Sequence, residues 1–198
     1  IRETSSTYFK EEAPQKKSNS ERAQEAAKEL VNPNTSYASL TLRNQFFSYT
    51  GDTPDADSQN STMSLFQPIV PFNRIDGSKI IFRPLVPIVT DNAWNSKAGL
   101  GDISLELTYA FAPLKTKPGR IRSIGIAASL PTGEDELGFG ESTSLGPKFV
   151  FGKLSKQAVL VMVNDHKWDI AGDEQVSLST VQAIAIHLPG GGWNYGSV

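Results

Sequence analysis

The stretch GLGDISLELTYAFAP, residues 99–113, decides the fold because apolar and polar side chains alternate along it. Its apolar positions are Ile103, Leu105, Leu107, Tyr109 and Phe111. A period of two is typical of a β-strand whose two faces meet different environments. The apolar face contacts either a protein core, with water outside, or lipid, with water inside a closed barrel.

The same pattern recurs along most of the chain. Eight segments of about ten residues carry it, and a ninth begins at Gly192. The eight are residues 38–49, 62–70, 79–89, 102–111, 121–130, 142–151, 158–168 and 176–188. At about 3.3 Å per residue they span some 33 Å, more than the strands of most soluble sheets. Short turns alternate with longer, more acidic loops between them, as in outer-membrane barrels. We therefore expect an antiparallel, up-and-down transmembrane β-barrel.

The second face of these segments carries small and polar side chains. A soluble barrel would show more long Lys and Glu side chains to water, whereas a narrow lumen suits Ser, Gly, Thr and a few charges. We expect four charged residues to line the lumen: Arg83, Asp102, Glu106 and Lys148. The alternative left open is that these four only pair with one another and brace the wall. Aromatic girdles at the membrane interfaces are expected from Tyr109, Phe111, Phe149, Phe151 and Trp168.

Residues 1–35 differ from the rest of the chain. Residues 1–17 are polar and predict a flexible arm. Ser18 and Glu21 form a capping-box pattern, and Pro33 ends the helix that follows. We expect a linker helix against the first strand; a plug or a periplasmic handle is the alternative. The barrel then occupies residues 36–198, with bulges expected where prolines interrupt its strands: Pro68, Pro84, Pro87 and Pro147.

Composition excludes several classes of protein. A net charge of -2 argues against nucleic-acid binding, and the absence of cysteine excludes disulfides and thiolate metal sites. With only His166 and His187 available, we predict no metal and no cofactor. The acidic loop around Glu134, Asp135 and Glu136 lacks the ligand spacing of a calcium loop and predicts a solvated outer loop. No apolar run approaches the roughly 18 residues of a membrane-spanning helix.

Six blocks in order carry a family resemblance. They are AQEAAKELVNPNTSYASLTLRNQFF, FQPIVPF, RPLVPIV, GLGDISLELTYAFAP, SLPTGEDELGFGESTSLGP and GGGW. From about Ala23 to Val198 the chain resembles the outer-membrane β-barrel family of transporters linked to the phenol meta-cleavage pathway. The resemblance implies a Gram-negative outer-membrane barrel of twelve strands, a loosely assigned transport role and no catalytic residues. The family continues through further strands and a terminal aromatic, and single-chain bacterial barrels have even strand numbers, so we expect this chain to be a fragment.

The function expected is a porin-like channel or transporter in the cell outer membrane for small molecules, aromatic or hydrophobic ones included. Its partners would be membrane lipid and a small-molecule solute, with no nucleic acid; the oligomeric state stays open. The first alternative is a lipid hydrolase in the outer membrane, for which His166, near Asp165 and Asp169, is the only candidate base. The second is a soluble β-sandwich that binds ligands.

Overall fold

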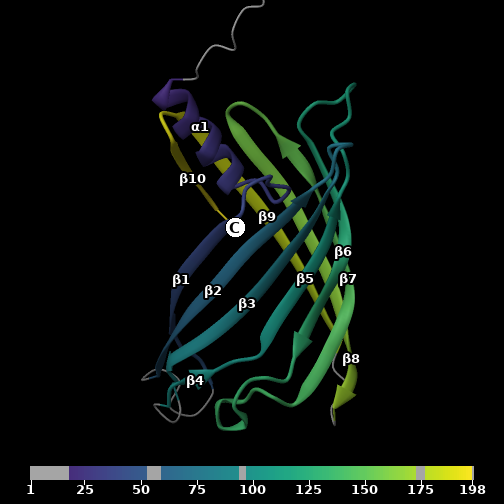
Figure 1. The fold of residues 1–198 in the computed structure, drawn as a ribbon. Helices are drawn as coiled ribbons and strands as arrows, with labels where there is room; N and C mark the ends of the chain where they lie inside the picture. The colour runs from purple at the N-terminus through teal and green to yellow at the C-terminus, as the bar shows by residue number, and fades with distance from the viewer. Residues whose placement is uncertain (1–17, 53–58, 94–96, 173–176, 198) are drawn as a thin grey trace, which may run out of the picture.

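The computed structural model describes residues 18–52, 59–93, 97–172 and 177–197, so the predicted flexible arm lies outside the described residues. Ten antiparallel strands form one sheet that curls into a half-barrel, with one short helix at one end (Figure 1). Along the sheet the strand order is β1-β2-β3-β5-β6-β7-β8-β9-β10, and the short β4 pairs with β3. The predicted all-β, up-and-down antiparallel order is confirmed.

The strands follow the predicted segments closely. The elements are α1 (Asn19–Leu30), β1 (Ser39–Ser48), β2 (Asn60–Asn73), β3 (Lys79–Asp91), β4 (Gly99–Leu100), β5 (Ile103–Ala110), β6 (Arg120–Leu130), η2 (Asp135–Leu137), β7 (Ser142–Leu154), β8 (Ala158–Gly172), β9 (Ser177–Gly190) and β10 (Trp193–Ser197). The eight segments of alternating pattern are the eight long strands, and the ninth is β10. Of the strands, only β4 was not predicted, because two residues carry no periodicity. The one-turn η2 lies in the segment that was predicted as a solvated loop.

The connections separate into two ends of the half-barrel. The links β2–β3, β5–β6, β7–β8 and β9–β10 lie at one end, which we call the turn end, and α1 lies there too (Figure 1). The links β1–β2, β3–β5, β6–β7 and β8–β9 lie at the opposite end, the loop end. Three of the four loop-end links are longer than every turn-end link, as predicted, but the β8–β9 link (173–176) is shorter than the β5–β6 link (111–119).

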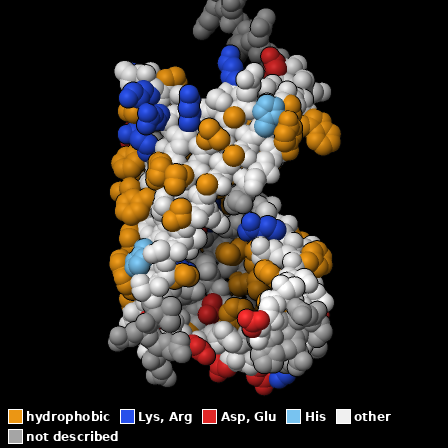
Figure 2. Space-filling model, turned by 180° about the vertical axis from the view of Figure 1, so that it is seen from behind, with side chains coloured by type: hydrophobic (Ala, Val, Ile, Leu, Met, Phe, Trp, Pro, Cys, Tyr) orange, Lys and Arg blue, Asp and Glu red, His pale blue; other side chains and the backbone are white. Residues whose placement is uncertain are grey.

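The two faces of the sheet differ in polarity. On the convex face apolar side chains are exposed (Figure 2). Leu107, Ile126 and Phe149 are 46%, 49% and 49% exposed. On the concave face Thr108 and Lys148 are buried. No second sheet covers the convex face among the described residues. The alternative of a β-sandwich fold is therefore wrong, because all ten strands belong to one curled sheet.

Prolines interrupt the hydrogen-bond ladder without shifting its register. Between β2 and β3 the pairing stops after Phe66↔Val86 and resumes at Val70↔Phe82 in the same register. Shifts of register occur elsewhere, at residues 62/63, 143/144 and 193/195. The prediction of bulges at the prolines is therefore wrong. A proline lacks a backbone N–H, and the β2–β3 ladder loses the three pairs around Pro68 and Pro84 without an extra residue.

Glycines allow the sheet to curl tightly at β6 and β7. A Cβ atom on Gly125 would overlap the carbonyl oxygen of Leu107 in β5, and one on Gly146 would overlap that of His166 in β8. Both glycines lie at positions that face the inside of the half-barrel, as do the buried residues of the same strands. Neighbouring backbones can approach there only because no side chain stands between them.

Helix α1 begins as predicted but lies elsewhere. The capping box is present: the Ser18 hydroxyl accepts from the Glu21 N–H, and the Glu21 carboxylate accepts from the Ser18 N–H. The helix packs beside β10, where Ala23 approaches Gly192 (Figure 1). The prediction that it lies against the first strand is therefore wrong. Of its apolar residues Ala27 is buried, whereas Leu30 is exposed.

No helix within the described residues is long and apolar enough to cross a membrane.

Candidate functional site

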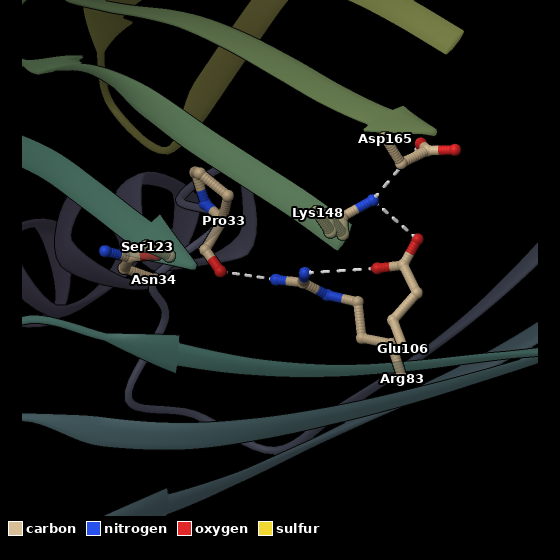
Figure 3. Close-up of polar contacts among 7 residues, drawn as sticks. All are labelled: Pro33, Asn34, Arg83, Glu106, Ser123, Lys148 and Asp165. Carbon is tan, nitrogen blue, oxygen red and sulfur yellow. Dashed lines mark hydrogen bonds and ion pairs between the residues drawn. The ribbon is translucent and has the colours of Figure 1, made fainter. Parts of the chain in front are cut away.

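Four charged side chains from four strands meet on the concave face (Figure 3). Glu106 of β5 lies between two cations: one carboxylate oxygen is 3.7 Å from the Arg83 guanidinium, and the other accepts from Lys148 Nζ at 2.8 Å. Lys148 is also 3.9 Å from Asp165 of β8. The chain Arg83–Glu106–Lys148–Asp165, which we call the charge network, therefore runs across the inner wall.

Strand register explains how these residues meet. Arg83 pairs directly with Glu106 across β3 and β5, and Lys148 pairs directly with Asp165 across β7 and β8. Strand β6 lies between the two pairs and presents only Gly125 opposite Lys148. A larger side chain at that position would stand in the way of Lys148. The small residues of β6 thus join two cross-strand ion pairs into one network.

The charge network is largely withdrawn from solvent. The exposed fractions of the side chains are 11% for Arg83, 24% for Glu106, 6% for Lys148 and 13% for Asp165. Two cations and two carboxylates balance, so the network has no net charge. Buried charges are tolerated when they are paired and hydrogen-bonded, and removing one partner leaves another uncompensated. The network pairs Arg83, Glu106 and Lys148 with one another, which is the arrangement that the bracing alternative expects.

Residues 31–36, which we call the plug segment, enter the half-barrel from the turn end. The Arg83 guanidinium donates a hydrogen bond to the Pro33 carbonyl (Figure 3). Asn34 makes three further contacts: its carbonyl accepts from Lys79 Nζ at 2.6 Å, its side-chain oxygen from the Ser123 hydroxyl at 2.5 Å, and its amide donates to the Arg122 carbonyl at 3.3 Å. The plug segment is thus bonded to β3 and β6 across the inside of the half-barrel.

The carboxylate of Glu29, in the last turn of α1, shapes the plug segment. It accepts hydrogen bonds from the Thr35 hydroxyl at 3.1 Å and the Ser36 N–H at 2.8 Å. The Asn32 side chain in turn accepts from the Asn34 N–H at 3.0 Å. These local bonds join residues 29–36 to one another and do not involve the wall.

An apolar cluster receives the start of the plug segment. Val31 packs against buried residues of the concave face at the turn end, which are Ile121, Val150, Val159, Val161, Val163 and Leu188. Burial of apolar surface stabilises by about 25 cal/mol per Å², so this contact favours the inserted position of the segment. The sequence predicted a concave face of small and polar side chains, but at the turn end this face is apolar.

A cavity of about 340 Å³ lies against the plug segment and the charge network. Its polar lining includes Arg43, Gln67 and Gln182 in addition to the charge network. Its apolar lining includes Ile69, Leu85 and members of the apolar cluster such as Val163. A cavity with polar and apolar lining can accommodate a small molecule that has both kinds of surface.

Asp102, the fourth predicted lumen residue, does not join the network. Its carboxylate accepts the backbone N–H groups of Gly133 and Gly140, each at 3.0 Å. It lies at the loop end, where it anchors the β6–β7 loop. The other three predicted residues, Arg83, Glu106 and Lys148, are brought together as described.

Sequence reasoning missed several members of the site. The sequence analysis considered Asp165 only as a partner of His166. The residues that share its face of β8, such as Val161 and Val163, are apolar and gave no sign of a polar site. In the structure Asp165 and His166 point to opposite faces: Asp165 faces Lys148, while His166 contacts the hydroxyls of Ser179 at 2.6 Å and Ser177 at 3.1 Å. Asn34 was also missed, since no local pattern indicates that a loop residue enters a barrel.

Among the residues that the structure describes, no three His, Asp or Glu side chains form a group that could hold a metal ion. Comparison of the chain with family models, curated proteins and solved structures found no match.

Proposed function

We propose that the chain forms the wall of an outer-membrane β-barrel channel or transporter for small molecules, and that the plug segment closes it at the turn end. The observation that carries the proposal is the polarity of the curled sheet: apolar side chains are exposed on the convex face, and the charge network lies on the concave face. A water-soluble protein seldom exposes so continuous an apolar surface, whereas lipid-facing strands require one.

The dimensions of the strands support the proposal. Strands β2, β3, β7, β8 and β9 have 13 to 15 residues. At about 3.3 Å per residue and a tilt near 40°, they rise some 33 to 38 Å, which exceeds the apolar band of about 25 Å in membrane barrels. The polar ends of each strand then reach water on both sides.

Among the described residues, the edge strands β1 and β10 each pair with a neighbour on one side only. Backbone N–H and C=O groups cannot stay unpaired in lipid, so membrane strands occur in closed barrels. We therefore propose that additional strands join β1 to β10 in the complete barrel, twelve in all.

Transport through the barrel would require the plug segment to leave its position or to leave space beside it. A solute that passes the concave face at the turn end must displace the segment or pass beside it. The bonds from Lys79 and Ser123 to Asn34 would break on displacement, while the charge network could remain intact. We therefore propose a channel that is closed while the plug segment is bonded to β3 and β6.

An engineered disulfide tests this proposal. The chain has no cysteine, and the side chains of Asn34 and Ser123 are in contact, so Asn34→Cys/Ser123→Cys offers a unique pair. In planar bilayers we expect the reduced variant to conduct and the oxidised variant to lose conductance, because the disulfide holds the plug segment in place. Ser123→Cys alone, treated with the same oxidant, is the matched control and should not change.

Two results would contradict the proposal. If neither the parent nor the reduced variant passes ions or small solutes in bilayers and liposomes, the barrel is not a channel. If oxidation leaves conductance unchanged, solutes do not pass through the plugged region.

A further inference from the structure

We propose that a groove on the convex face, at the turn end of β6–β9, binds an anionic phospholipid. Its phosphate would contact Arg120, Arg122 and Lys153, and one acyl chain would lie in the groove. The inference rests on the proposed membrane barrel and adds a specific lipid site to it.

Small side chains of β9 form the floor of the groove, and larger apolar side chains of β8 stand beside it. Its volume is about 530 Å³. Small residues of β9 lie directly opposite large residues of β8: Ala183 pairs with Met162, and Ala185 pairs with Leu160. The step from large to small side chains leaves a depression in the convex face. An acyl chain fits such a depression because it is narrow, flexible and apolar.

Three cations lie at one end of this groove. Arg120 and Lys153 occupy directly opposite positions on β6 and β7. Like charges directly opposite each other destabilise a sheet. Among the described residues, no acidic side chain forms an ion pair with either of them. The pair therefore lacks a counter-charge within this part of the chain, and an external anion would supply it.

Arg122 is the third cation of this group, and contacts with residues 111 and 112 hold its guanidinium in place. Its guanidinium donates to the Ala112 carbonyl at 3.2 Å and lies 5.5 Å from the centre of the Phe111 ring. Arg122 pairs with Phe151 on β7, two residues along the strands from the Arg120–Lys153 pair and on the same face. Arginine binds phosphate through two parallel N–H groups, so a fixed guanidinium beside two further cations favours a phosphate.

The position of the cations distinguishes a lipid from other anions. Basic side chains gather at the turn-end margin of the convex face, and apolar side chains cover the surface next to them (Figure 2). In the proposed barrel this margin lies at the level of the phospholipid headgroups. A free phosphate would contact the cations and leave the groove empty, whereas a phospholipid occupies both.

Native mass spectrometry of the full chain in dodecyl maltoside tests the site. Dioleoylphosphatidylglycerol is titrated into the parent and into Arg120→Gln/Lys153→Gln. We expect one lipid to bind the parent, at least about tenfold more tightly than dioleoylphosphatidylcholine, and the double variant to lose at least about tenfold in affinity, since each charge-assisted contact contributes about that factor. The double variant removes a like-charge pair, so it should fold as well as the parent, which circular dichroism checks.

Two controls separate the contributions of charge and groove. Lys115→Gln/Lys117→Gln removes the same charge from the neighbouring turn, outside the groove, and should bind the lipid within about twofold of the parent. Ala183→Leu fills the groove without changing charge and should weaken binding of both lipids.

Several outcomes would overturn the inference. Equal affinity of the parent and Arg120→Gln/Lys153→Gln, in a protein that needs detergent, would reject the lipid site and leave the barrel intact. Displacement of the lipid by an equal concentration of glycerol phosphate would show a phosphate site without a role for the groove. A parent that stays dispersed without detergent and binds no lipid would reject the membrane barrel and the lipid site together.

Discussion

Replacement of Lys148 by methionine tests whether the charge network braces the wall. Lys148 is 6% exposed and lies between two carboxylates, at 2.8 Å from Glu106 and 3.9 Å from Asp165. In Lys148→Met, Glu106 keeps the Arg83 guanidinium, but Asp165 loses its cation in the network. Breaking a buried pair costs about 3 to 5 kcal/mol. Because Glu106 remains paired, we expect a loss near the lower value, about 3 kcal/mol, or about 150-fold in the unfolding equilibrium.

A second substitution makes this prediction specific. Lys148→Met/Asp165→Asn removes the uncompensated carboxylate, so part of the lost stability should return and leave a deficit of about 1 to 2 kcal/mol. Urea unfolding in phosphatidylcholine vesicles, followed by tryptophan fluorescence, measures both variants. Asp165→Asn alone is the matched single variant that completes the cycle.

The refuting result is a small effect. If Lys148→Met costs less than about 1 kcal/mol, the charges are individually solvated, because exposed pairs contribute no more than that. The concave face would then be wet at this level, and the four side chains would not act as one network.

Three further predictions concern the wall and its turns. Leu105→Arg places a charge on the convex face and should cost about 2 to 4 kcal/mol of folding free energy in lipid, whereas Ser104→Arg on the concave face should cost less; equal losses would show that both faces are packed against protein. Gly146→Ala introduces a Cβ atom that overlaps a carbonyl oxygen of β8, so we expect a loss of about 3 kcal/mol in the same urea assay. In the β2–β3 turn, Ser78 donates two hydrogen bonds to the Asp76 carboxylate, one from its hydroxyl and one from its backbone N–H. Both lower the pKa of Asp76, and the hydroxyl has the larger effect. This contribution to stability is fully present above the ordinary aspartate pKa near 4 and disappears as pH falls through the lower folded value, so the difference between the parent and Asp76→Asn should shrink below about pH 4. An undiminished difference at pH 2 would show that the carboxylate charge is not the cause.

Local patterns were sufficient to predict the wall. In Ile103–Ala110 the alternation assigns every side chain to a face, since a strand has a period of two and any shift by one residue would expose the wrong set. The same argument placed Arg83, Glu106 and Lys148 on the polar face before their contacts were known. The capping box of Ser18 and Glu21 similarly defined the start of α1, because its hydrogen bonds join residues three positions apart.

Prediction was less successful where the signal was mixed. The apolar side chains around Asp165 in β8 concealed that it shares the concave face with Lys148. The prolines suggested bulges, but only the pairing of β2 with β3 shows that three pairs are lost and the register is kept.

The sequence by itself determined which residues form strands, which face each one presents and how the connections sort between the two ends, because these properties depend on neighbours a few positions apart. Only the tertiary structure decided that Glu106 joins Arg83 to Lys148, and that Asn34 enters the half-barrel to meet Ser123. Those contacts join residues about 40 and 90 positions apart. They depend on the register of several strands at once and on the small side chains of β6, and no local pattern in the chain encodes either condition.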